Sequence, residues 1–228
     1  MPELFSRSPL YEFADAGGAL RIVGERLVVA ERQGVEKLIL RGDRNDLDSC
    51  ARHHAGIELP ARPNTLATSN EGRICLWQKP DQWMLLLPGR RFGPEQQVLR
   101  TTLGGGRVFD ASARFVLLQL QGADALALLA TGCGVDLRPA RFGDGQCAST
   151  RIERVPVCIF RVAEESGYQL LVESPLARHL WLWLVSASRE FACLPQHLLH
   201  GFADEGSQHS STSAPTGRDA AHLDVKRA

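Results

Sequence analysis

Hydrophobic residues along the chain form short runs of strand length, separated by clusters of glycine, proline and charged residues. The runs predict strands at residues 27–32, 36–41, 73–78, 82–87, 107–110, 115–121, 146–151, 155–162 and 168–173. Turn residues between neighbouring runs indicate hairpins. Gly34 would join the first two runs, and Pro80 with Asp81 would join the third and fourth.

Four segments between these runs have the spacing of helices: residues 45–55, 94–103, 124–131 and 175–191. Asn45 or Asp46 would cap the first helix, and Gly56 would end it. Strand pairs interrupted by single helices favour an α+β fold with mainly antiparallel sheets and packed helices. The sequence contains no obvious internal repeat, but the order of elements suggests two comparable lobes.

We therefore expect a two-lobed body over residues 1–203, with lobes at roughly 1–105 and 106–203. The composition changes at about Asp204. Small and polar residues then dominate, with almost no large apolar side chains between Ser207 and Ala221. Such a segment buries too little surface to offset the entropy lost on ordering, so residues 204–228 are predicted to be a disordered tail.

The last predicted helix is apolar on more than one face. One stripe at helical spacing is expected to face the core and comprises Leu176, Leu180, Trp183, Leu184, Ala187 and Phe191. Trp181, Leu182 and Val185 lie off that stripe and form a second cluster. Either another element of the chain covers this cluster, or it is a partner-binding surface with Trp181 as its aromatic anchor.

A long loop between the third helix and the following strand contains Arg138, Arg141 and Asp144. Loops present polar groups at the surface, so Arg138 and Arg141 are secondary candidates for a subunit interface. They can equally be solvated surface charges.

Composition limits the kinds of partner. The 228 residues include 26 Lys+Arg and 26 Asp+Glu, so the charge balance gives no sign of a nucleic-acid binder. No apolar run is long enough to span a membrane, and the N-terminal residues lack the pattern of a signal peptide. The 6 cysteines contain no Cys-x-x-Cys pair. We expect reduced, mostly buried thiols and a cytoplasmic protein.

Residues that could carry chemistry are few and dispersed. Cys133, between two glycines, has no histidine close in sequence to act as its base, and is expected to be a small residue packed at a helix end. Cys193, His197 and His200 have metal-ligand spacing, but Pro195 interrupts the helix that would align them. The glycine clusters lack the pattern of a phosphate-binding loop. We predict neither a catalytic residue nor a bound metal or cofactor.

Several phrases of the sequence match a known family in order and spacing. They occupy residues 40–43, 56–60, 63–65, 76–77, 80–86 and 177–184. The most specific phrase is Thr131-Gly132-Cys133-Gly134-Val135-Asp136-Leu137-Arg138-Pro139, followed by Phe142, Gly145, Cys147, Ala148 and Thr150. Together they resemble the gamma subunit family of heterotetrameric sarcosine oxidase, over roughly residues 8–195.

The resemblance implies a small gamma subunit beside a large alpha, a flavin-binding beta and a zinc-binding delta subunit. It assigns FAD, FMN, NAD, tetrahydrofolate and zinc to those partners and no cofactor to this chain. Such an assembly oxidatively demethylates sarcosine to glycine. It yields formaldehyde or 5,10-methylenetetrahydrofolate, together with hydrogen peroxide. The gamma chain is then expected to hold its partners in register without taking part in the chemistry.

The family also resembles a reduced form of the glycine-cleavage T-protein fold. T-proteins carry an aspartate just after a Gly-rich turn, as a charge partner for the folate. The approximate counterpart here, residues 151–156, has no Asp, and its Glu153 has arginines nearby on both sides. A solvated ion pair is the expected role of Glu153. A stand-alone folate-binding protein of the T-protein type remains the alternative, and an interaction module of a different amine oxidase is a third possibility.

Overall fold

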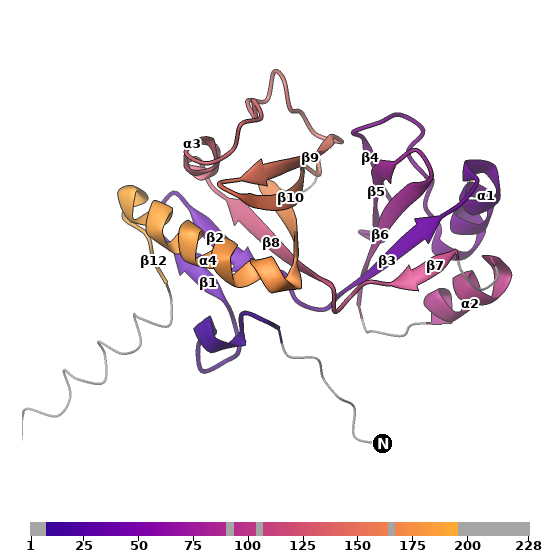
Figure 1. The fold of residues 1–228 in the computed structure, drawn as a ribbon, viewed down its shortest axis with the longest axis horizontal. Helices are drawn as coiled ribbons and strands as arrows, with labels where there is room; N and C mark the ends of the chain where they lie inside the picture. The colour runs from indigo at the N-terminus through magenta and orange to yellow at the C-terminus, as the bar shows by residue number, and fades with distance from the viewer. Residues whose placement is uncertain (1–7, 90–93, 104–106, 164–166, 196–228) are drawn as a thin grey trace, which may run out of the picture.

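A computed structural model describes residues 8–89, 94–103, 107–163 and 167–195. Two antiparallel sheets form the centre of the molecule, and helices cover the outer face of each (Figure 1). The layers are helix, sheet, sheet, helix. This arrangement confirms the predicted α+β fold with antiparallel sheets and packed helices.

The larger sheet has, among the described residues, seven strands in the order β12-β1-β2-β8-β11-β10-β9. They are β1 (Arg21–Val23), β2 (Val28–Glu31), β8 (Phe115–Gln121), β9 (Cys147–Ile152), β10 (Val155–Phe160), β11 (Tyr168–Glu173) and β12 (Leu194–Pro195). Helices α3 (Ala125–Ala130) and α4 (Ser174–Ser188) pack on its outer face. Two 3-10 helices, η1 (Tyr11–Phe13) and η2 (Arg189–Phe191), lie next to α4.

The smaller sheet has the strand order β4-β5-β6-β3-β7. Its strands are β3 (Val35–Arg41), β4 (Leu66–Thr68), β5 (Ile74–Lys79), β6 (Gln82–Pro88) and β7 (Val108–Asp110), and its helices are α1 (Arg44–Ala55) and α2 (Pro94–Leu103). Gly56 ends α1 as predicted, in a left-handed conformation with φ 55°. The cap is Asp43 and not Asn45 or Asp46, because the extended backbone of Asp43 lets its carboxylate accept from Asn45 N at 2.9 Å.

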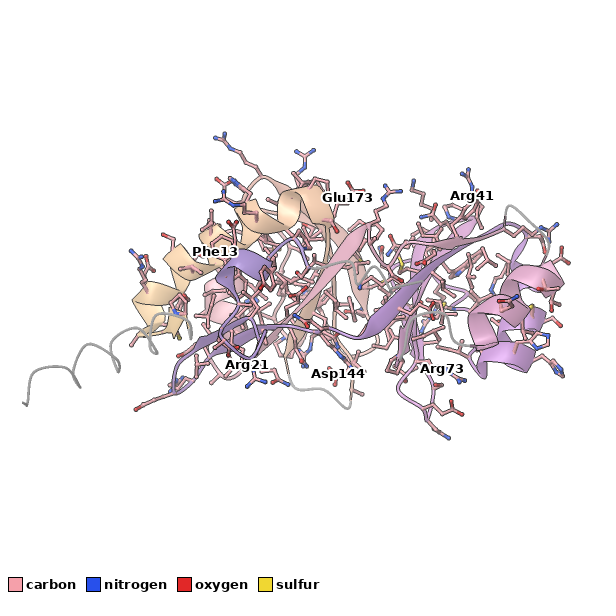
Figure 2. All side chains as sticks on the ribbon, turned by 90° about the horizontal axis from the view of Figure 1, so that it is seen from below. Phe13, Arg21, Arg41, Arg73, Asp144 and Glu173 are labelled. Atoms are coloured by element: carbon pink, nitrogen blue, oxygen red, sulfur yellow. The ribbon has the colours of Figure 1, made fainter. Side chains whose placement is uncertain are left out.

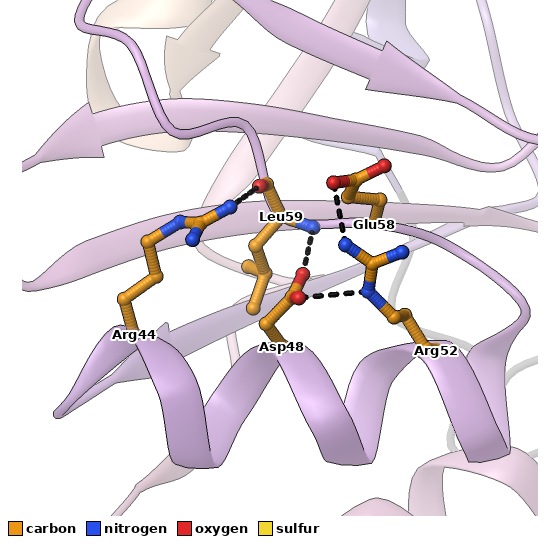
Figure 3. Close-up of polar contacts among 5 residues, drawn as sticks. All are labelled: Arg44, Asp48, Arg52, Glu58 and Leu59. Atoms are coloured by element: carbon orange, nitrogen blue, oxygen red, sulfur yellow. Dashed lines mark hydrogen bonds and ion pairs between the residues drawn. The ribbon is translucent and has the colours of Figure 1, made fainter.

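A polar cluster ties α1 to the irregular segment that follows it (Figure 3). Asp48 accepts hydrogen bonds from Leu59 N and from Arg52 Nε, both at 2.7 Å. Arg52 also bonds to Glu58, and Arg44 donates to Leu59 O at 2.8 Å. Burial raises the pKa of Asp48, but the donors of Leu59 and Arg52 outweigh it and the pKa is lowered. Ionised Asp48 therefore stabilises the fold of this segment.

Side chains alternate across the strands and so produce three hydrophobic cores. On β6, Trp83, Leu85 and Leu87 face the helices of the smaller sheet, whereas Met84 and Leu86 face the larger sheet. The core between the sheets also contains Ile74, Leu76, Leu117, Cys147, Cys158, Phe160, Val162 and Leu171. Because the central strands are covered on both faces, their sequences are continuous apolar runs. Charged side chains such as Arg41 and Asp144 lie at the periphery (Figure 2).

The edges of the two sheets are joined by hydrogen bonds where β4 and β9 begin. Thr65 and Gln146 form an antiparallel bridge. Leu66 N donates to Gly145 O at 2.9 Å, and Cys147 N donates to Asn64 O at 3.0 Å. We call this junction the seam. It fixes the end of the α3–β9 loop to the other sheet.

One prediction about connectivity is wrong. The runs at 27–32 and 36–41 do not form a hairpin, because β2 pairs with β8 and β3 pairs with β6. The division between the two sheets also does not coincide with the expected boundary between lobes at about residue 105. The N-terminal strands β1 and β2 belong to the sheet of the second half, and β7 belongs to the sheet of the first. The connection at Gly34 crosses between sheets, which local turn residues do not reveal. Residues 204–228, the predicted tail, lie outside the described residues.

Candidate subunit-interface surface

The core-facing side of helix α4 is rotated from the predicted stripe, of which Leu180 and Leu184 are fully buried and the other members only partly. Its buried residues are Ala177, Leu180, Trp181, Leu184 and Ser188. Trp181 is 0% exposed and packs between α4 and the larger sheet, so for this residue the first of the two alternatives holds, in which the chain itself covers it. Its indole Nε1 is buried and has no hydrogen-bond partner. Both stripes are apolar, and contacts with the sheet decide which one faces inward.

The neighbouring candidates are only partly exposed. Leu182 is 42% exposed, whereas Val185 is half-buried and packs against the core. One turn before Leu182, Arg178 donates to Glu12 of η1 at 2.6 Å. This ion pair holds η1, with Tyr11 55% exposed, beside the outer face of α4. The predicted cluster of three residues is thus reduced to Leu182, with Tyr11 on the adjoining 3-10 helix.

The loop between α3 and β9 is held by contacts on its inner side. Leu137 and Phe142 are buried in the core of the larger sheet. Tyr168 donates its hydroxyl to Leu137 O at 2.7 Å. Arg161 stacks over the Tyr168 ring at 5.3 Å and pairs with Asp144 at 3.1 Å. These contacts give the loop a defined shape although it has no regular secondary structure.

Arg138 and Arg141 lie on the outer side of this loop. Arg138 O accepts from Arg141 N and from Phe142 N, both at 2.8 Å, which forms a single turn. Arg138 also binds Asp136 through two nitrogens, at 2.8 and 2.6 Å. These bonds lower the pKa of Asp136 to about 2, and the charge of Arg141 contributes. Among the described residues, Arg141 itself has no ion-pair partner.

The residues considered for chemistry do not converge. Glu153 occupies the two-residue turn of the β9–β10 hairpin with φ 54°, and pairs weakly with Arg154 at 3.9 Å. Cys133 follows α3, where its N–H caps the helix by donating to Leu129 O at 2.9 Å, and it bridges to Ile152. Both positions fit the structural roles expected from the sequence.

The cysteines are free thiols, and those other than Cys133 are buried. Cys147 and Cys158 adjoin one another on β9 and β10. Their mutual hydrogen bond lowers the pKa of Cys147 and, together with burial, raises that of Cys158. Cys193 is buried, and its thiol lies 3.3 Å from Phe191 O. Its suggested co-ligands His197 and His200 lie outside the described residues.

In the described part of the chain, no group of three or more His, Cys, Asp or Glu side chains is placed to hold a metal ion. None of its helices combines the length and the apolar character needed to cross a membrane.

Comparison with known proteins identifies the family. A profile of the sarcosine oxidase, gamma subunit family matches residues 41–190. The sarcosine oxidase subunit gamma of Corynebacterium sp. (strain U-96) is 32% identical over 194 residues, which are 82% of this chain and 91% of the relative. The chain belongs to the sarcosine oxidase gamma subunit family. The gamma subunit of Arthrobacter sp. is 34% identical over 140 residues, or 60% of this chain and 67% of the relative.

Solved structures agree with this assignment to the gamma subunit family. A chain of the heterotetrameric sarcosine oxidase from Corynebacterium sp. U-96, in complex with pyrrole 2-carboxylate, superposes with a TM-score of 0.69 and 28% identity. The match covers 81% of this chain and 95% of that one. The glycine cleavage system aminomethyltransferase T from Bartonella henselae gives a TM-score of 0.51 at 18% identity, covering 70% of this chain and 45% of that one. The resemblance inferred from the sequence is thereby confirmed for the family and for the T-protein-like fold.

Sequence reasoning missed the residues that support the candidate surface of the gamma subunit. Arg161 and Tyr168 hold the α3–β9 loop from β10 and β11, and Gln146 Oε1 accepts from Gly143 N at 2.8 Å within it. Gly132 lets Trp183 of α4 pack closely, since an added Cβ would overlap the indole. Most of these contacts join residues far apart in the sequence, so local patterns do not indicate them.

Proposed function

We propose that this gamma subunit is a structural, non-catalytic member of a heterotetrameric sarcosine oxidase. The observation that carries the proposal is the match to almost the whole of one chain of such an oxidase, 95% of its length. The assembly would convert sarcosine to glycine, with formaldehyde or 5,10-methylenetetrahydrofolate and hydrogen peroxide as further products. This chain would keep the alpha, beta and delta subunits aligned, because catalytic geometry tolerates little displacement.

The distribution of reactive groups supports a role outside the chemistry. A nucleophile needs a base within hydrogen-bond reach, and Cys133 instead uses its backbone to end α3. Glu153, in the approximate sequence counterpart of the T-protein turn that carries the aspartate, is exposed in a hairpin turn beside Arg154. We accordingly assign FAD, FMN, NAD, tetrahydrofolate and zinc to the partner subunits.

Leu182 on α4 and Arg138 and Arg141 on the α3–β9 loop are the proposed contact residues. Leu182 offers an exposed aliphatic side chain, and the arginines offer guanidinium groups, which are enriched at interfaces. Val185 contributes at most its outer atoms, because it also packs against the core. Trp181 is excluded from this set by its burial.

Co-expression of the full chain with the other subunits tests the proposal. The gamma chain should copurify in a fixed ratio with a tag placed on the largest subunit. Omitting it should lower the yield or the turnover of the assembled oxidase. Failure of the wild-type chain to copurify would refute the proposal.

The alternative function is a stand-alone folate-binding protein, favoured only by the T-protein-like fold. Titration of the isolated full chain with tetrahydrofolate separates the two. Saturable binding at one equivalent would support the alternative. If the chain does not bind tetrahydrofolate but does copurify with the other subunits, the structural role is supported.

A further inference from the structure

The two segments that lead into the seam, residues 61–66 and 136–146, carry more positive than negative charge. Their charged side chains are Arg62, Asp136, Arg138, Arg141 and Asp144. Arg161 of β10 is counted with them because it pairs with Asp144. Four guanidinium groups therefore accompany two carboxylates. Both carboxylates are already used, Asp136 by Arg138 at 2.6 Å and Asp144 by Arg161 at 3.1 Å.

Arg62 and Arg141 account for the excess charge. Both side chains are exposed, and neither has an ion-pair partner in the described part of the chain. Arg62 lies in the turn before β4, where Thr65 Oγ1 donates to Arg62 O at 2.7 Å. Arg141 lies close enough to Asp136 to help lower the pKa of that carboxyl. The hydrogen bonds of the seam join the residues just after Arg62 to the end of the loop that bears Arg141.

The backbone supporting these arginines is well fixed, and part of that support is energetically unfavourable. The Arg161 guanidinium stacks on Tyr168, yet its Nε is buried without a hydrogen-bond partner. Leaving a buried donor unpaired costs free energy. An ordered loop with unpaired cations at its outer side is suited to binding an anionic group without first losing conformational entropy.

We propose that the seam, with Arg62 and Arg141 as its unpaired cations, is an electrostatic docking surface for a carboxylate-rich face of another subunit of the oxidase. The inference rests on the proposed function and identifies which surface serves it. Guanidinium groups bind carboxylates through paired hydrogen bonds, which gives orientation as well as attraction. Because the seam joins both sheets, a partner bound there contacts both halves of the gamma subunit at once.

The experiment uses the full chain co-expressed with its partner subunits. The test variant is the double charge reversal Arg62→Glu/Arg141→Glu. The matched control is Arg189→Glu, which reverses one exposed arginine that has no ion-pair partner in the described part of the chain and lies on η2, away from the seam. The fraction of gamma subunit retained in the complex is measured by size exclusion at increasing salt concentration.

Wild type and control should stay bound at low salt and be released as salt rises, because salt screens exposed charges over about 10 Å at 0.1 M. The double variant should show about tenfold or greater loss of retention at low salt. Equal retention of the double variant and wild type at every salt concentration would overturn the docking surface while leaving the proposed function intact. Release of wild-type gamma under all conditions would instead overturn the proposed function.

Folding of the variant is checked separately by circular dichroism of the full chain. If the double reversal does not fold, the neutral pair Arg62→Gln/Arg141→Gln replaces it, with a smaller but same-signed loss of retention expected. Unchanged retention of that folded neutral pair would also overturn the proposal.

Discussion

Replacement of Trp181 tests whether α4 faces the core with the stripe found in the structure. Trp181→Ala removes a fully buried indole and leaves a cavity in the core. Such truncations cost about 3–5 kcal/mol, a large part of the roughly 5–15 kcal/mol that stabilises a typical protein. Trp181→Phe should cost less, about 0–2 kcal/mol. It keeps most of the apolar contact and removes the unpaired Nε1–H, whose burial costs roughly 1–3 kcal/mol.

Urea unfolding of the full chain, followed by far-ultraviolet circular dichroism, measures these differences. The matched control is Leu182→Ala at the adjacent, exposed position, which should change stability by no more than about 0.5 kcal/mol. The expected order of midpoints is wild type and Leu182→Ala highest, Trp181→Phe close below, and Trp181→Ala clearly lowest. A midpoint for Trp181→Ala equal to that of Leu182→Ala would refute the orientation of α4 described above.

Three further predictions concern local packing and charge. Asp48→Asn should destabilise the fold by about 1 kcal/mol at neutral pH, because the neutral amide binds Leu59 N more weakly than the carboxylate does; urea unfolding measures the loss. The folded-state pKa of Asp48 lies below its unfolded value of about 3.9, so its contribution is present above that pH and lost as pH falls through the folded pKa. The stability difference between wild type and Asp48→Asn should therefore shrink in acid, and a constant difference from neutral pH down to acid unfolding would contradict this. Gly132→Ala should cost about 1–3 kcal/mol by displacing Trp183, whereas Gly134→Ala, with open space around it, should be nearly neutral in thermal melts.

The sequence predicted most individual elements closely. Helix α1, the β5–β6 hairpin and the strands β8 to β11 lie within a few residues of their expected positions. Local signals suffice there, since Gly56 stops a helix by its own backbone freedom and Pro80 and Asp81 favour a turn wherever they occur. The candidate loop residues Arg138 and Arg141 were also identified as surface groups from the sequence.

Connectivity and helix orientation could not be predicted in the same way. Gly34 permits a turn, but whether that turn returns the chain to the same sheet depends on β8, more than eighty positions later. Likewise, the periodicity of α4 allows Trp181 or Trp183 to face the core. In the folded chain Trp181 packs into the core of the larger sheet, and Gly132 provides the space that Trp183 occupies.

The chain by itself determined the α+β class, the elements and the resemblance to the gamma subunit family, because these depend on residue type and short-range spacing. Only the tertiary structure decided the pairing of β2 with β8, the burial of Trp181 and the joining of the two sheets at the seam. Each of these depends on contacts between residues distant in the sequence. Their free energy comes from burial and hydrogen bonding between whole layers, which no local pattern of residues encodes.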